Sequence, residues 1–138
     1  MNESFIELFR GRLIGVMSED EYDALAGSLD GAWIAVDFSA DEARVSSVSG
    51  EEAGKMMADM RDEIKARNML NVTYPYTYVH TPEAPRMIKL YDPRRCGSGC
   101  STSSPDPWWV FSTTPPAEAE LEELKPSRKR KGLRGLFG

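Results

Sequence analysis

The residues best suited to chemistry lie in one loop, at positions 92–107. It contains both cysteines of the chain, Cys96 and Cys100, which are separated only by Gly-Ser-Gly. The two glycines permit tight backbone turns, so both sulfurs can reach one soft metal ion, such as Cu(I), zinc or the iron of an iron–sulfur cluster. The loop is therefore a candidate metal site with Cys96 and Cys100 as ligands.

Other roles for the same thiols stay open. The guanidinium groups of Arg94 and Arg95 would lower the thiol pKa, and the two cysteines could then act as a redox pair that forms a reversible disulfide. Structural zinc sites and iron–sulfur clusters commonly take four protein ligands, so two cysteines per chain predict a cluster shared across a homodimer. The third interpretation is that both are incidental thiols in a surface turn.

His80 is the only histidine and the natural third ligand to consider. A hairpin turning at Glu83 would place His80 near Arg86 and Tyr74 near Asp92. Cys96 would then leave from the opposite end of the hairpin, on the order of 20 Å from His80. We therefore expect His80 to be a polar residue at a strand end rather than a ligand.

Two regions are candidates for partner binding. The first is an aromatic surface beside the loop, which could anchor a protein or stack on bases, with core packing as the alternative. It comprises Tyr74, Tyr76, Tyr78, Tyr91, Trp108 and Trp109.

The second candidate is the C-terminal tail, residues 125–138, which joins a basic cluster to apolar residues. That combination suits a docking peptide, an anionic membrane surface or RNA, and a solvating end is the alternative. The side chains concerned are Arg128, Lys129, Arg130, Lys131, Leu136 and Phe137.

The charges of the chain are segregated. Of 17 basic and 22 acidic residues, six basic and no acidic ones lie in 125–138, so the first 124 residues carry a formal charge of −11. An acidic body is a poor surface for polyanions, and a nucleic acid or anionic membrane would have to meet the tail.

The composition is that of a soluble globular protein, with 138 residues, 41% hydrophobic and 28% charged. No apolar run approaches the roughly 20 residues that span a bilayer. Residues 1–4 lack the positive charge that begins a secretory signal. These features predict a cytoplasmic protein, in which thiols stay reduced.

The patterning predicts an α+β fold, with an N-terminal helical pair followed by a β-β-α-β-β unit and a short extra strand. The first helix covers 5–17 with a break near Gly11, and the second starts at Ser18, which heads a capping box, and ends at Asp30-Gly31. The next two elements, 32–38 and 44–48, are expected to form a hairpin, and Ser49 is expected to cap a helix at 51–67. The remaining elements are expected at 71–80, 86–91 and 108–112. Pro75 predicts that 71–80 is an edge strand or holds a bulge.

The chain divides into a compact domain, 1–115, and a C-terminal part, 116–138, with a short helix at 117–124 and a basic tail expected to be disordered alone.

The function predicted from these features is a non-catalytic accessory or adaptor protein that binds a larger protein partner. It would handle a metal or iron–sulfur centre through Cys96 and Cys100. The first alternative is a small thiol-redox enzyme using the same pair, and the second is a nucleic-acid or membrane adaptor acting through the tail. The sequence contains neither a Ser–His–Asp arrangement nor a phosphate-binding loop.

Overall fold

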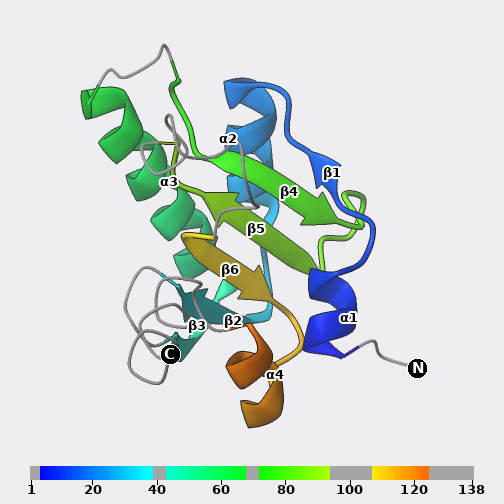
Figure 1. Cartoon of the computed structure of the whole chain (residues 1–138). Helices are drawn as coiled ribbons and strands as arrows, with labels where there is room; N and C mark the ends of the chain where they lie inside the picture. Colours follow the sequence, from blue (N-terminus) through cyan, green and yellow to red (C-terminus); the bar gives the residue numbers. More distant parts are fainter. Residues whose placement is uncertain (1–3, 39–42, 68–71, 94–106, 125–138) are drawn as a thin grey trace, which may run out of the picture.

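The computed structural model describes residues 4–38, 43–67, 72–93 and 107–124 (Figure 1). These residues form four helices and a six-stranded antiparallel sheet with the order β1-β4-β5-β6-β2-β3, which confirms the predicted α+β class. The elements are α1 (Phe5–Phe9), β1 (Ile14–Gly15), α2 (Glu19–Ser28), β2 (Ala32–Asp37), β3 (Arg44–Ser49), α3 (Gly50–Arg67), β4 (Tyr76–His80), β5 (Met87–Tyr91), β6 (Trp109–Ser112) and α4 (Glu118–Glu123).

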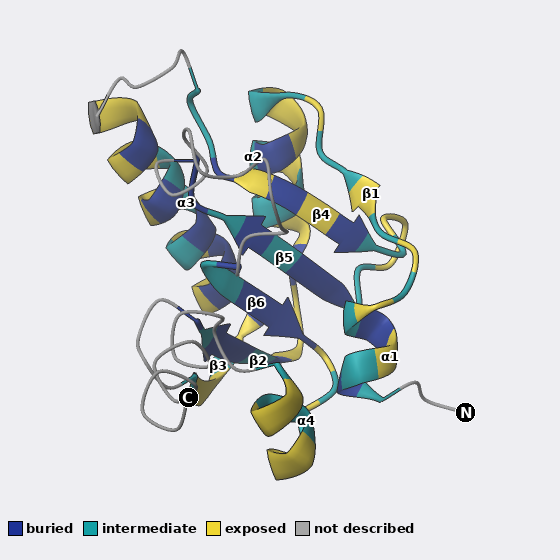
Figure 2. Cartoon of the chain, viewed as in Figure 1, coloured by how far each residue is buried: buried dark blue, intermediate teal, exposed yellow. Residues whose placement is uncertain are grey.

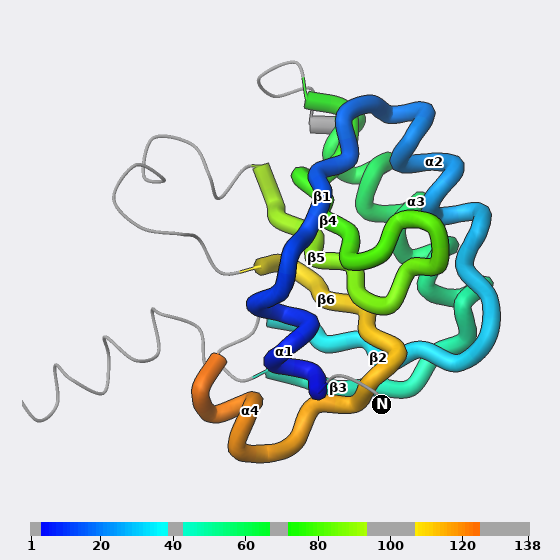
Figure 3. Tube along the Cα trace, turned by 90° about the vertical axis from the view of Figure 1, so that its right-hand side faces the viewer, coloured from blue at the N-terminus to red at the C-terminus, as the bar shows by residue number. Residues whose placement is uncertain are grey.

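Helices cover both faces of the sheet, but unequally. The longer helices α2 and α3 lie on one face, while α1 and α4 pack against part of the other (Figure 3). The first face buries a large cluster comprising Tyr22, Leu29, Trp33, Ala35, Ala53, Met57, Met60, Val79, Ile88, Leu90 and Phe111. The second buries a smaller one comprising Phe5, Leu8, Val36, Phe38, Met87 and Val110.

The two long helices begin at the predicted serine caps. The Ser18 hydroxyl accepts a hydrogen bond from the Glu21 backbone N–H at 3.1 Å, but the Glu21 carboxylate accepts from the Met17 N–H rather than from Ser18, so the predicted capping box is only half formed. The Ser49 hydroxyl accepts a hydrogen bond from the Glu52 N–H at 3.0 Å. The carboxylate of Glu52 accepts from the Ser49 N–H in return, which completes a capping box. Local sequence therefore determines where α2 and α3 start.

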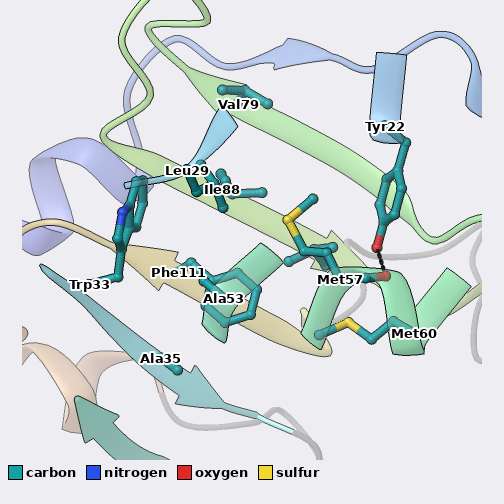
Figure 4. Packing of buried hydrophobic residues seen from close by; sticks show 11 residues of the cluster. Tyr22, Leu29, Trp33, Ala35, Ala53, Met57, Met60, Val79, Ile88 and Phe111 are labelled. Carbon is teal, nitrogen blue, oxygen red and sulfur yellow. Dashed lines mark hydrogen bonds between the residues drawn. The ribbon is translucent and has the colours of Figure 1, made fainter. Parts of the chain in front are cut away.

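The contact between α2 and α3 is close and includes one buried polar bond. The Tyr22 hydroxyl donates to the Met57 carbonyl at 2.6 Å within the large cluster (Figure 4). Gly50 and Gly54, one turn apart on α3, lie against the backbone of Asp30 and Ala26. A Cβ at Gly54 would overlap the Ala26 carbonyl of α2, and a Cβ at Gly50 would overlap the Asp30 backbone just after α2 ends.

The predicted first helix is too long. The observed helix α1 ends at Phe9. Ile14–Gly15 instead forms β1, which pairs with Val79 and Tyr78 of β4. The expected break near Gly11 is present, since α1 ends two residues before it. A Cβ at Gly11 would lie 2.9 Å from the Glu7 carbonyl and 3.2 Å from the His80 ring. The helical spacing of the apolar residues in 5–17 thus hides a change from helix to strand.

The predictions for 71–80 also need correction. β4 starts at Tyr76, directly after Pro75, and it is not an edge strand because β1 pairs with its outer side. The β4–β5 register pairs His80 with Met87, one residue away from the predicted pairing with Arg86. The turn between them begins at Thr81, whose φ is 60°, and is one residue longer than expected.

The extra strand at 108–112 is central to the fold. As β6 it lies between β5 and β2, and Val110, Phe111 and Ser112 are fully buried. The sequence predicted this strand but not its position, because its pairing partners are distant along the chain.

The short predicted helix at 117–124 is present as α4. Leu121 and Leu124 pack against the smaller cluster, the Ile6 N–H donates to the Glu120 carboxylate at 3.0 Å, and Arg10 pairs with Glu123 at 2.6 Å. The division between a domain at 1–115 and a C-terminal part stays a prediction. Within the described ranges, no helix combines the length and apolar character needed to cross a membrane.

Candidate functional site at the loop end of the sheet

The cysteine loop departs from and returns to adjacent central strands. β5 ends at Tyr91 and β6 begins at Trp109, which pairs with Leu90. The residues at both ends of the loop, Asp92, Pro93 and Pro107, are buried. The Trp108 N–H donates to the Leu90 carbonyl at 2.7 Å, so the two anchors of the loop are held together by backbone pairing.

Three tyrosines lie beside these anchors on one face of the sheet. Tyr76 pairs directly with Tyr91 across β4 and β5, and the Tyr78 ring meets the Tyr91 ring edge-on with centroids 5.8 Å apart. Tyr76 and Tyr78 are 40% and 42% exposed, and the strand alternates between exposed and buried residues (Figure 2). We refer to Tyr76, Tyr78 and Tyr91 as the tyrosine patch.

Lys89 lies within this patch. It pairs with Tyr78 across the strands, and its Nζ lies 3.8 Å from the centre of the Phe9 ring and 5.8 Å from that of Tyr91. Nζ also donates to the Phe9 carbonyl at 3.4 Å, a long hydrogen bond. Burial lowers the pKa of the Lys89 ammonium group to about 8.

The aromatic residues predicted to form one surface are divided between the two faces. Tyr74 precedes Pro75, and its ring centroid lies 5.6 Å from that of Tyr22, on the face that α2 and α3 cover. The Trp109 ring stacks on the Phe111 ring with centroids 6.1 Å apart. Trp108 and Trp109 both pack against the large cluster and are half-buried. A partner-binding role for the two tryptophans stays a prediction.

His80 lies at the opposite end of the β4–β5 hairpin from the loop anchors, as predicted. Its Nδ1 lies 2.7 Å from the Thr81 hydroxyl oxygen. Across the described ranges, no group of three or more potential ligands from His, Cys, Asp and Glu is placed to hold a metal ion.

Most of the remaining predicted site residues lie outside the described residues. These are Arg94, Arg95, Cys96, Cys100, Arg128, Lys129, Arg130, Lys131, Leu136 and Phe137. Their roles as metal ligands, thiol-activating groups or partner contacts stay predictions.

Sequence reasoning missed Lys89. The available signal was a lysine between Ile88 and Leu90 in an apolar strand, because charged residues are uncommon in central strands without a partner. Recognising the signal requires knowing that β6 makes β5 a central strand.

Two shallow grooves flank α2 and are separate from the tyrosine patch. One, of about 380 Å³, lies beside β1 and is lined by residues that include Ile14, Val16 and Leu25. The other, of about 460 Å³, lies between α2 and α3 and carries the Arg61–Asp23 ion pair. Neither groove gathers aromatic and cationic side chains as the patch does.

Comparison with known proteins does not indicate a function for this chain. The chain matches no known protein family, and it has no significant match among curated proteins or solved structures.

Proposed function

We propose that this protein is a non-catalytic accessory protein that binds a larger protein partner through the tyrosine patch. The observation that carries the proposal is the exposure of Tyr76 and Tyr78 side by side on a regular strand. Tyrosine is enriched among the residues that dominate binding energy at protein interfaces. Its large ring also loses little conformational entropy when it becomes ordered against a partner.

Neighbouring strands hold Tyr78 on both sides within the patch. Tyr78 packs against Gly15 of β1 on one side and against the Tyr91 ring on the other. Its backbone is fixed by pairing with both β1 and β5. A preorganised surface binds with a smaller entropic penalty than a loop that must first become ordered.

The position of the loop anchors links the patch to the cysteines. Because Tyr91 ends β5 directly before the first loop anchor, and Tyr76 pairs with Tyr91, a partner on the patch would also be near the loop anchors. We therefore keep the metal or iron–sulfur role of Cys96 and Cys100 as part of this proposal, with a partner as donor or recipient of the centre.

Site-specific photo-crosslinking followed by a quantitative binding assay tests the proposal. A photoreactive residue at position 76 should capture the partner, and one at Val45 should not. Val45 is 46% exposed but lies on β3, four strands away in the sheet order. Mass spectrometry would identify the captured protein for purification.

Affinity for the purified partner then decides the matter. The double variant Tyr76→Ser/Tyr78→Ser should weaken binding by at least about tenfold, whereas Val45→Ser should leave it unchanged. Both variants change exposed side chains, so their circular dichroism spectra should match that of the wild type. Unchanged affinity in the double variant would exclude the patch as the interface.

A further inference from the structure

Lys89 is a cation without an ionic partner in the described part of the chain. The ion pairs found there use Arg10, Arg61 and Lys65, and no carboxylate lies within 4.0 Å of the Lys89 Nζ. Its contacts are instead the Phe9 ring and carbonyl and the more distant Tyr91 ring. An ammonium group has three donor hydrogens, so the single long bond to Phe9 leaves donor capacity unused.

This arrangement is unfavourable for the folded protein on its own. A half-buried ammonium group loses hydration, and the Phe9 ring returns only about 0.5–2 kcal/mol as a cation–π contact. An apolar side chain at position 89 would avoid that loss while covering the same neighbours. The alternative to a binding role for Lys89 is that its aliphatic stem covers apolar surface while its ammonium group reaches water.

We propose that Lys89 binds a carboxylate of the protein partner, and that the segment recognised carries an Asp or Glu next to an aromatic residue. The inference rests on the proposed function, because it assigns the partner chemistry of the same patch. The aromatic residue would pack against Tyr76 and Tyr78, while the carboxylate would accept the remaining donor hydrogens of Lys89. Charge-assisted bonds of this kind are roughly twice as strong as neutral ones.

A peptide carboxylate suits the site better than a nucleic-acid phosphate. The first 124 residues carry a formal charge of −11, which repels a polyanion over many angstroms. A segment with one or two carboxylates meets that repulsion only weakly and gains a local contact with Lys89, which has no ionic partner among the described residues. The tyrosines provide apolar contact to either ligand, so charge decides between them.

A pair of matched peptides tests the proposal on the full-length protein. Acetylated and amidated Ala-Glu-Tyr-Glu-Ala and Ala-Gln-Tyr-Gln-Ala differ only in charge. Chemical-shift titration at pH 7, following the Lys89 side chain and the β4 and β5 amides, gives the affinity of each. The glutamate peptide should bind about tenfold more tightly, with the largest shifts at Lys89 and Tyr78.

Variants separate the anion site from the patch as a whole. Lys89→Met should reduce the affinity for the glutamate peptide to that for the glutamine peptide, and Lys89→Arg should restore most of it. Lys55→Met removes an exposed lysine from α3, on the other side of the sheet, and should change neither affinity.

The contrary outcomes are distinct. If both peptides bind equally and Tyr78→Ala weakens both, the patch binds a partner but Lys89 is not an anion site. If neither peptide shifts the Lys89 signals, or an octamer of deoxythymidine binds there more tightly than either, the carboxylate proposal is wrong. Failure of the proposed function would instead appear as intact partner binding in Tyr76→Ser/Tyr78→Ser.

Discussion

The contact between α2 and α3 allows a sharp test of the fold at Gly54. A Cβ built on Gly54 would lie 2.2 Å from the Ala26 carbonyl oxygen, whereas ordinary contacts begin near 3.4 Å. The obstructing atom belongs to the backbone, so no side-chain rotation can relieve the overlap. Gly54→Ala would therefore force the helices apart by roughly 1 Å in a closely packed interior.

Two opposing effects set the magnitude. Replacing a mid-helix glycine by alanine favours the helix by about 1 kcal/mol, while overpacking a core typically costs about 1–3 kcal/mol and sometimes more. The separation would also strain the Tyr22–Met57 hydrogen bond, which crosses the same contact at 2.6 Å. We expect Gly54→Ala to lower the free energy of unfolding by about 2 kcal/mol.

Gly27 provides the matched control, because it lies in α2 and a Cβ there meets nothing within 4 Å. Gly27→Ala should raise the free energy of unfolding by about 0.5–1 kcal/mol through helix propensity alone. Urea unfolding followed by circular dichroism measures both variants. A Gly54→Ala protein as stable as the wild type, alongside a stabilised Gly27→Ala, would show that the helices are not in backbone contact.

Three further predictions address the site and the tail. Lys89→Met should raise the free energy of unfolding at pH 7 by roughly 1–3 kcal/mol, because the folded-state pKa of about 8 lies below the usual 10.5. The stability advantage of Lys89→Met over the wild type should shrink as pH rises from 8 to 10.5, because in this range the unfolded wild-type chain still binds a proton that its folded form has released. Urea unfolding that gives the same difference in free energy across this pH range would contradict the prediction. In anaerobically purified protein, Cys96→Ser and Cys100→Ser should each lose the same property, either metal content or redox reactivity. If an iron–sulfur cluster is bound, sedimentation should show that the protein carrying it is a dimer. Two variants that keep every wild-type property would make the thiols incidental. Deleting 125–138 should change the free energy of unfolding by less than about 0.5 kcal/mol. The deletion should nevertheless weaken binding to any acidic partner of the tail and make that binding less dependent on salt concentration. Full retention of the binding would leave the tail only a solubilising role.

The sequence predicted the elements whose signals are local. The caps at Ser18 and Ser49 lie within three residues of the groups they bond, so α2 and α3 could be located from short windows. The β2–β3 hairpin was predicted for a similar reason, because its strands are separated by only a few residues.

Elements that depend on distant partners were predicted less well. Residues 14–15 have the spacing of a helix face but form a strand, because they pair with the outer side of β4, more than sixty positions later. The one-residue error in the β4–β5 register reflects a turn whose length depends on the left-handed conformation of Thr81. Neither feature has a signal in the nearby sequence.

Dependence on distant strand pairing also explains why only part of the candidate site could be predicted from the sequence. Tyr76 and Tyr78 could be assigned to one face from alternation alone, but their neighbours could not. Insertion of β6 between β5 and β2 gives β5 pairing partners on both sides, which leaves Lys89 in the interior of the sheet. The same insertion makes the cysteine loop begin and end at the strand ends that carry Tyr91 and Trp109. The pairing of β6 with β5 thus brings the two loop anchors together and places Lys89 between two neighbouring strands, whereas the tyrosine patch depends on the β4–β5 pairing. A variant that weakens β6 should therefore disturb Lys89 and the loop anchors more than the tyrosines of the patch.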